Sequence, residues 1–472
     1  MSKQLAISAT MAVTIALSMA AQTFAGQVYT REEAIKVALE NSSDVKSAEE
    51  SLKKTQSAVS EGYGNAYPSI DLSAKVTRIF GLDDVKASSD MSDAMKGMAQ
   101  NPDYGAPSAY DMAAAGGIDG LVSAMKAQGY RWQSSLGITA TQILYAGGKV
   151  GTGIEIAKTA KLASEITLEK TKNDVRAQVD EAFNTVIFLD SSVAVTEETM
   201  ELLQNAVDLA TQAYQSGLGT ELDVVRAQLE LDGLKSGIEG LKKTQIVARN
   251  GILNIMGLPY DPEVKFTGEF RDPEKTPMPD LSMEGVKKRR KELAQLAAKE
   301  EIDTKLVDIE EGSFKPTVVL VGGVEYSNKQ NEFYKWDAPN WDKNINKYIA
   351  LAVTMNLFNG KQTTEKVAQA KSDLRSTQIL KDQAERGFRL QIESCLSTLG
   401  NARQQIDMKK RSVELAQKNY DLTDAAFKVG RETQINLLTA LVSLRKAKLE
   451  YFEALKNWNS AYEALLQATG EY

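Results

Sequence analysis

Two short stretches decide how this sequence is organised: Leu144-Tyr145-Ala146-Gly147 and, 213 positions later, Leu357-Phe358-Asn359-Gly360. The same offset relates identical residues downstream, over more than a hundred positions without a gap: Gly217 and Gly430, Thr220 and Thr433, Ala227 and Ala440, Ala248 and Ala461, Gly257 and Gly470. Self-similarity at a fixed offset indicates repeated structural units. We therefore interpret the chain as an internal duplication.

Upstream of these stretches the two copies match at a larger offset of 248 positions. Tyr67-Pro68-Ser69-Ile70 corresponds to Lys315-Pro316-Thr317-Val318, and Val45 corresponds to Leu293. The first copy therefore holds 35 additional residues between its two matched parts. They fall within residues 81–130, a stretch rich in Met, Ala, Gly and Asp without clean periodicity, which we expect to be a long loop.

The offsets, the proline content and the N-terminal pattern together divide the chain into four parts. They are a signal peptide, 1–25; a first repeat, 26–257; an inter-repeat linker, 258–284; and a second repeat, 285–472. The linker is assigned from its composition, because five of the ten prolines lie between Pro259 and Pro279. Proline neither continues a helix nor donates a hydrogen bond to a sheet.

The N-terminus has the pattern of a protein export signal. Lys3 precedes an apolar stretch from Leu5 to Ala21, and a small residue, Ala25, ends the region. This pattern is typical of a signal peptide cleaved after Ala25, although an uncleaved membrane anchor is the alternative. No later segment has the roughly 18 consecutive apolar residues of a transmembrane helix. No cysteine stands directly after the cleavage site to carry a lipid anchor, because the next residue is Gly26.

Long segments of both copies have the apolar spacing of laterally packed helices. Apolar residues alternate spacings of four and three over 175–214 and 224–255 in the first copy, and over 388–427 and 437–468 in the second. A sustained repeat of 3.5 residues makes an apolar seam along a helix. Each copy is therefore expected to form a helical hairpin, with a first helix of about 100 Å at about 1.5 Å per residue. Cys395, the single cysteine, falls on a seam and is expected to be a packing residue.

Four other segments alternate apolar and polar residues with the period of two that is typical of β-strands. Their apolar positions are Ile70, Leu72, Ala74 and Val76; Leu136, Ile138 and Ala140; Val318, Leu320, Gly322 and Val324; and Ile349, Leu351, Val353 and Met355. Each segment has about ten residues, the length of a tilted membrane-spanning strand.

Strands can span a bilayer only as a closed barrel, because every backbone polar group needs a partner there. Membrane barrels have about eight strands or more, so four strands per chain cannot close one alone. A barrel would have to be shared between two, three or four copies, and the sequence does not choose among them. The alternative is a water-soluble sheet with one wet face.

Composition excludes several classes of function. The chain has no histidine, which removes imidazole catalysis and histidine metal sites. Its one cysteine cannot form an internal disulfide or a cysteine metal cluster. A net charge of −7 gives no basic surface for nucleic acid.

The duplicated order of helix, strand, loop, strand and helical hairpin resembles the TolC-like outer-membrane factor family. Four motifs carry the resemblance across nearly the whole mature chain. They are a helix-to-strand entry, Tyr67–Leu72; strand-to-helix exits, Gln142–Gly148 and Asn356–Gly360; a hairpin tip, Tyr214–Val224; and a repeat end, Leu253–Gly257.

The resemblance implies a mixed α+β membrane protein that assembles as a homotrimer. Twelve strands, four from each chain, would form a β-barrel in the Gram-negative outer membrane, continued by a long α-helical barrel in the periplasm. The implied function is passive conduction of substrates from an inner-membrane transporter through a periplasmic adaptor. Such a duct is not an enzyme and needs no catalytic residue, metal or cofactor.

The resemblance also points to two groups of residues. The hairpin tips are expected to face the adaptor and to form the pore entrance: Gly217, Thr220, Asp223, Gly430, Thr433 and Asn436. Turn and helix-capping chemistry is an equally good account of these residues. The junctions between strands and helices are expected at Pro68, Gly147, Gly148, Pro316 and Gly360.

Several alternatives stay open at the level of sequence. Within the channel interpretation, small-molecule or drug efflux is favoured on family frequency, and type I protein secretion is the alternative. A coiled-coil surface protein would share the heptads and the signal peptide, but it would not need paired amphipathic strands. An enzyme would need a carboxylate pair on the loop 81–130.

Overall fold

The structure, a computed structural model, describes residues 27–80, 131–330 and 344–472. The predicted signal peptide and the predicted loop 81–130 lie outside these residues. The chain divides into two compact units. Among the described residues, the helical unit comprises 27–57, 158–303 and 373–472, and the strand unit comprises 58–80, 131–157, 304–330 and 344–372.

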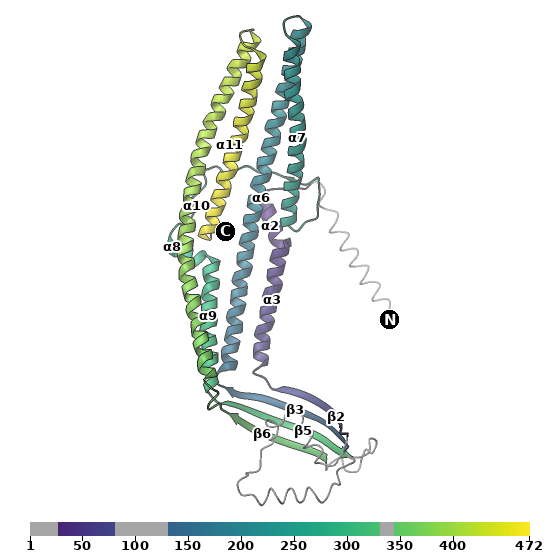
Figure 1. Ribbon diagram of the computed structural model, residues 1–472, viewed down its shortest axis with the longest axis vertical. Helices are drawn as coiled ribbons and strands as arrows, with labels where there is room; N and C mark the ends of the chain where they lie inside the picture. The colour runs from purple at the N-terminus through teal and green to yellow at the C-terminus, as the bar shows by residue number, and fades with distance from the viewer. Residues whose placement is uncertain (1–26, 81–130, 331–343) are drawn as a thin grey trace, which may run out of the picture. The chain divides into compact units, whose positions relative to one another are not determined.

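Each copy contains the same series of helices (Figure 1). The first copy has α2 (Arg31–Asn41), α3 (Ser43–Gly64), α6 (Lys149–Gln215) and α7 (Glu221–Ile255). The second copy has α8 (Met283–Arg289), α9 (Lys291–Glu311), α10 (Gln362–Lys428) and α11 (Gln434–Thr469). The helices α6 and α10 have 67 residues each, and both are joined to their partners at a hairpin tip. The predicted mixed fold with an internal duplication is confirmed.

The predicted seams form the core of the helical unit. On α6 the seam residues Val175, Val179 and Val186 are no more than 1% exposed. On α10 the seam residues Ile392, Leu399 and Ile406 are buried and pack with α11 through Trp458 and Leu465. Fully burying one such side chain stabilises a fold by about 1.5–3 kcal/mol. The heptad pattern therefore marks the residues that hold the helices together.

A glycine contact is repeated in both copies of the helical unit. Gly257 follows α7 at φ +66°, and a Cβ there would lie 2.5 Å from the carbonyl oxygen of Asn41, at the break between α2 and α3. Gly470 follows α11 at φ +76°, and its Cβ would lie 3.0 Å from the backbone of Arg289, at the break between α8 and α9. Only glycine combines this backbone conformation with so close an approach. The duplication therefore extends to individual contacts.

The four predicted strands form one antiparallel sheet in the strand unit. They are β2 (Ser69–Arg78), β3 (Trp132–Ala146), β5 (Thr317–Gln330) and β6 (Ile345–Thr354), in the spatial order β2-β3-β5-β6. The strand with the weakest sequence pattern, β3, is the longest at 15 residues. Its pattern is weak because several of its outward positions are small or polar, although it pairs on both sides.

The residues of the predicted linker pack on the helical unit. The short strand β4 (Lys265–Phe266) pairs in parallel with β1 (Val28–Tyr29). The Phe266 ring stacks on Tyr29 and meets Phe183 of α6 edge-on, each with ring centroids 6.0 Å apart. This aromatic cluster ties the start of the first copy to the segment between the copies.

None of the helices in the described parts of the chain combines the length and hydrophobicity that a membrane-crossing helix needs.

Candidate functional site

The sheet carries an exposed apolar face. Antiparallel pairing brings Leu72 opposite Ile138, Ile138 opposite Val324, and Leu320 opposite Leu351. Opposite residues of a sheet lie on the same face, so the apolar positions of all four strands form one surface. Leu72 is 72% exposed and Ile349 is 84% exposed. An apolar surface spread over four strands indicates contact with a nonpolar medium or another protein.

The opposite face of the sheet is mainly polar, although Ile143, Val319 and Val321 also lie on it. Asp71 pairs with Thr139, Lys75 with Ser135, and Gly137 with Glu325. The outer strands β2 and β6 each have one hydrogen-bonded neighbour within the described sheet. Their other edges therefore present backbone donors and acceptors that can pair with a further strand.

The first hairpin tip brings Gly217, Thr220 and Asp223 together. Gly217 has φ +74°, which allows the chain to leave α6. Thr220 is the N-cap of α7, and its side chain accepts a hydrogen bond from the Asp223 backbone at 3.3 Å. The Asp223 carboxylate accepts in return from the Thr220 backbone at 3.3 Å and from its hydroxyl at 2.6 Å. This reciprocal capping box satisfies amides that the helix start leaves unpaired.

The second tip is built differently. Gly430 has φ +71°, but the Thr433 side chain makes no capping hydrogen bond to any described residue. Glu432 corresponds in role to Asp223 of the first tip: its carboxylate accepts from the Thr433 backbone at 3.2 Å and from the Asn436 side chain at 2.7 Å. These hydrogen bonds, that of Asn436 first, lower the pKa of Glu432. Each tip therefore carries one carboxylate that accepts the backbone N–H of the N-cap threonine.

Glu432 was missed by the sequence analysis. The matching position of the first copy is Gly219, so comparison of the repeats gives no carboxylate there. The signal that could have identified it is its place directly before a helix start, where a carboxylate is favoured by the unpaired amides and the helix dipole.

The predicted junction residues lie where strands and helices meet. Pro68 precedes β2 and Pro316 precedes β5. Gly147, at φ +67°, and Gly148, at φ +89°, separate β3 from α6. Gly360, at φ +64°, lies between β6 and α10. A Cβ at Gly147 would overlap the carbonyl oxygen of Gly312, so the junction also requires a close backbone approach.

A buried ionic cluster in the helical unit was not foreseen from the sequence. Arg31 of α2 donates to Asp180 at 2.9 Å, to Asn184 at 2.7 Å and to Glu463 at 3.2 Å. Arg271, from the segment between the copies, contacts Asp180 and Glu463 at 3.4 Å each. The two acids are only 2% and 4% exposed. Two arginines thus face two carboxylates in a site that links both copies.

The Glu463 carboxylate has an unusual environment within this cluster. Its Oε1 accepts hydrogen bonds from Asn184 and Arg31, while its buried Oε2 has no hydrogen-bond partner among the described residues. Burial, reinforced by the negative charge of Asp180, raises the pKa of Glu463 to about 7. Tyr472 donates to Asp180 at 3.2 Å, and burial raises its pKa as well. The cluster links four segments of the chain, and the charge of Glu463 within it depends on pH.

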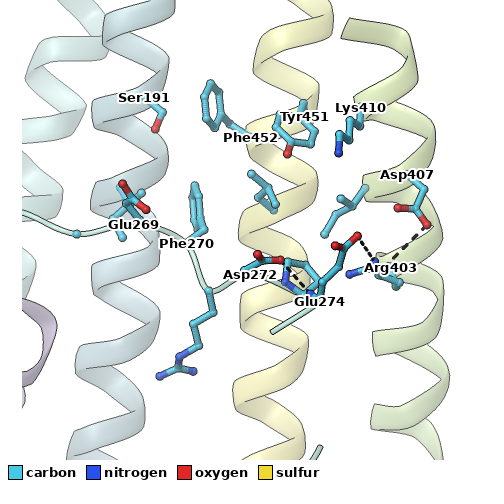
Figure 2. A pocket seen from close by; sticks show the side chains of 16 residues that line it. Ser191, Glu269, Phe270, Asp272, Glu274, Arg403, Asp407, Lys410, Tyr451 and Phe452 are labelled. Carbon is cyan, nitrogen blue, oxygen red and sulfur yellow. Dashed lines mark hydrogen bonds and ion pairs between the residues drawn. The ribbon is translucent and has the colours of Figure 1, made fainter. Parts of the chain in front are cut away.

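A groove of about 490 Å³ opens beside this cluster, where the segment 268–274 crosses α6, α10 and α11. Figure 2 shows Phe270 and Phe452 on one side and Arg403 on the other. Arg403 pairs with Glu274 at 3.2 Å and with Asp407 at 3.9 Å. Partly exposed pairs of this kind contribute about 1 kcal/mol or less. The groove therefore holds ordinary surface ion pairs and aromatic contacts.

Two other kinds of site are a metal site and a reactive thiol, and both can be checked in the described residues. No group of acidic or cysteine side chains there could hold a metal ion. Cys395 is partly buried beside the core of α10 and α11, and burial raises the pKa of its thiol. A thiol with a raised pKa is a poor nucleophile, which agrees with a packing role.

Comparison with protein families finds the same duplication. The family model described as outer membrane efflux protein matches the chain twice, over residues 34–258 and 284–471.

Curated relatives are distant in sequence. The chain is 19% identical over 327 residues to the outer membrane protein TolC of Salmonella enteritidis, across 68% of this chain and 66% of that protein. It is 22% identical over 357 residues to the outer membrane efflux protein BepC of Brucella suis, across 72% of this chain and 73% of the relative. The matched region therefore spans about two thirds of the length of the first relative.

Solved structures show the same fold. The outer membrane protein VceC of Vibrio cholerae matches with a TM-score of 0.69 at 16% identity, covering 93% of this chain and 96% of that one. The CmeC outer membrane channel of Campylobacter jejuni matches with a TM-score of 0.72 at 14% identity, covering 93% and 85%.

Proposed function

Because this chain belongs to the outer membrane efflux protein family, we propose that it is the exit duct of a tripartite export system. It is an outer-membrane protein that extends into the periplasm, and it is a channel rather than an enzyme. In this proposal the duct conducts substrates passively. An inner-membrane pump supplies the energy and a periplasmic adaptor joins the two.

The exposed apolar face of the sheet is the main observation in support of this proposal. Its four strands expose apolar residues on one side and polar residues on the other, as membrane-spanning strands do. Both edges of the sheet are available for pairing, so copies of the chain can extend it. Three chains would give the twelve strands that the resemblance implies, with the apolar face toward lipid and the polar face toward the channel.

The helices support the same assembly. On α10 a second apolar row, separate from the seam, recurs every seven residues at Met408, Leu415 and Leu422 and continues at Val429, directly after the helix; these side chains are 52–70% exposed. On α7 Leu222, Val225 and Leu229 are similarly exposed at 54–70%. Apolar rows with heptad spacing are suited to packing against further helices. In the proposed homotrimer they lie between neighbouring protomers of the helical barrel.

The hairpin tips are the proposed adaptor contact and pore entrance. Gly217, Thr220 and Asp223 form one tip and Gly430, Thr433 and Asn436 the other, with Leu218 87% exposed beside Gly217. The exposed Leu218 side chain, next to this capped turn, is available for apolar contact with a partner protein. The carboxylates of Asp223 and Glu432 add negative charge to the same ends.

Small-molecule efflux is the proposed transport activity, because the family is described by efflux and BepC bears that name. The test is the accumulation of an efflux-reporter dye in cells with and without this chain, with secreted proteins collected in parallel. Higher accumulation on deletion, reversed by complementation, supports efflux. Unchanged dye with a missing secreted protein would move the assignment to type I secretion. No change in either, in cells shown to make the protein and to lack a second exit duct, would contradict the export proposal.

A further inference from the structure

The strand hairpins of the two copies have the same register. In the first copy Ser69 pairs with Thr141, and in the second Thr317 pairs with Thr354. Adding the two sequence offsets, 248 and 213, to the first pair gives the second pair. The two copies therefore share the same backbone pairings, residue by residue.

One further ladder joins the two copies. Here β3 of the first copy pairs with β5 of the second, with Thr141 opposite Val321 and a register shift between Ile143 and Tyr145. By the same offsets, β6 corresponds to β3 and β2 corresponds to β5. The free edges of the sheet are thus the counterparts of two strands that already pair with each other.

In the proposed trimer β6 of one protomer meets β2 of the next, and we propose that the two strands pair in the register of the β3–β5 ladder. This inference rests on the proposed trimer and specifies how its strands meet. The offsets convert the pair Thr141–Val321 into Thr354 with Ser73 of the partner subunit. They likewise convert Ile138–Val324 into Leu351 with Val76 of the partner subunit.

The chemistry of the paired faces agrees with this register. Leu351 and Val353 would lie opposite Val76 and Ala74 of the partner subunit, continuing the apolar face across the joint. Thr354 would lie opposite Ser73 of the partner subunit, on the polar face. A shift by one residue would place every apolar side chain of β6 on the polar face. Shifts by two residues preserve the faces, so another observation must exclude them.

A glycine contact at the end of the ladder supplies that observation. Gly147 and Gly312 approach so closely that a Cβ on Gly312 would lie 2.8 Å from the Gly147 carbonyl oxygen. Their counterparts are Gly360 and Gly64. A Cβ added to either of these glycines would meet no atom within 4 Å among the described residues of one chain. The backbone of Gly360 has φ +64°, as Gly147 has +67°. We therefore assign Gly360 a contact with Gly64 of the partner subunit, which fixes the register.

The lengths of the strands also support the proposed joint. The strands β3 and β6 begin at equivalent residues, Trp132 and Ile345, but β3 has 15 residues and β6 has 10. The five residues that β6 lacks include Leu357 and Phe358, which are 88% and 82% exposed. Their counterparts Leu144 and Tyr145, which lie within the long strand, are 55% and 43% exposed. In the proposed joint β6 extends by these residues and covers part of their surface.

Disulfide trapping in the full-length protein tests the register. In a Cys395→Ala background, Thr354→Cys is combined with Ser73→Cys, and membranes are treated with a mild oxidant. Opposite residues of an antiparallel pair are about 4.5–5.5 Å apart at Cα, within the range that a disulfide spans. The expected result is a covalent trimer that survives denaturation and is lost on reduction.

Matched pairs distinguish the possible outcomes. Thr354→Cys with Asp71→Cys, or with Lys75→Cys, tests a shift by two residues in either direction. Thr141→Cys with Val321→Cys is the equivalent pair inside one chain and should yield only an oxidised monomer. Faster trapping by a shifted pair, or no trapping of Ser73 in an assembled trimer, overturns the register and leaves the export proposal intact. If the unsubstituted chain forms no trimer in the membrane, both the assembly in the proposed function and this inference are wrong.

Discussion

At the scale of single residues, the buried cluster of Arg31, Asp180, Arg271 and Glu463 is the most consequential feature of the helical unit. It is electrically balanced when all four groups are ionised, yet one oxygen of Glu463 lacks a hydrogen-bond partner among the described residues. A buried carboxylate with unsatisfied hydrogen-bonding capacity favours its protonated form. The cluster should therefore respond to pH within the range that a periplasmic protein meets.

We expect Glu463→Gln to alter the pH dependence of stability. The pKa of Glu463 is raised to about 7, so folding takes up a proton, and the contribution of this group to stability declines as the pH rises from about 4.5 to about 7. Relative to the variant, the unsubstituted protein should lose on the order of 1–3 kcal/mol across that window. Thermal unfolding of purified protein at several pH values measures the difference. A constant difference across the window would show that Glu463 does not titrate there, and Glu274→Gln, in the surface pair, is the control.

We expect Thr220→Ala to destabilise the start of α7 by about 1 kcal/mol, because it removes the hydroxyl that accepts from the Asp223 backbone and donates to the Asp223 carboxylate. The matched variant Thr433→Ala should cost less, since the Thr433 side chain caps no described amide. Hydrogen exchange of the amides in the first turn of α7 reports the local change. Equal effects of the two substitutions would show that the caps do not differ as the structure indicates.

At the scale of elements, the two faces of each strand are suited to different media. The face that includes Leu351 is apolar and exposed, while Ala352 points to the polar face of the same strand. A difference of one position therefore separates a lipid-facing residue from a channel-facing one in the proposed assembly.

We expect Leu351→Lys to reduce assembly in membranes far more than Ala352→Lys. A lysine on the lipid face of a barrel costs about 2–4 kcal/mol near the middle of the bilayer, and a channel-facing lysine stays hydrated. Folding into lipid vesicles against urea measures both variants. Equal tolerance of the two substitutions would mean that this face does not meet lipid.

At the scale of the whole molecule, the duplication makes one chain a pair of near-equivalent units whose joint is described once, between β3 and β5. A heterologous contact closes a ring when its repeated rotation returns to the first copy. The joint inside the chain is thus a template for the joints between chains.

We expect Gly64→Ala to weaken the trimer while leaving the single chain folded. An added Cβ meets nothing within 4 Å among the described residues of one chain, but it would press on Gly360 of the partner subunit, as a Cβ on Gly312 would press on Gly147. The control is Gly62→Ala, whose Cβ has ordinary contacts at 3.6 Å or more. The temperature at which trimers dissociate in detergent should fall for Gly64→Ala only. An unchanged trimer would argue against the glycine contact between protomers.

Much of this molecule is determined by its sequence alone. The helical seams, from Val175 on α6 to Ile406 on α10, and the alternating faces of the strands follow from periodicity. Periodicity is set by the geometry of neighbouring residues along one chain, and it is visible without knowledge of the fold. The two sequence offsets likewise determined the duplication, because each copy repeats the same local requirements at Gly217 and Gly430.

Only the tertiary structure decided which distant residues meet. Arg31, Asp180, Arg271 and Glu463 come from four separate segments, and none has a local pattern that marks it as buried. The register of β3 on β5 and the approach of Gly147 to Gly312 also join the two copies across long stretches of chain. Charge pairing and close backbone contact depend on positions in space, and packing fixes those positions only after the helices and strands have formed.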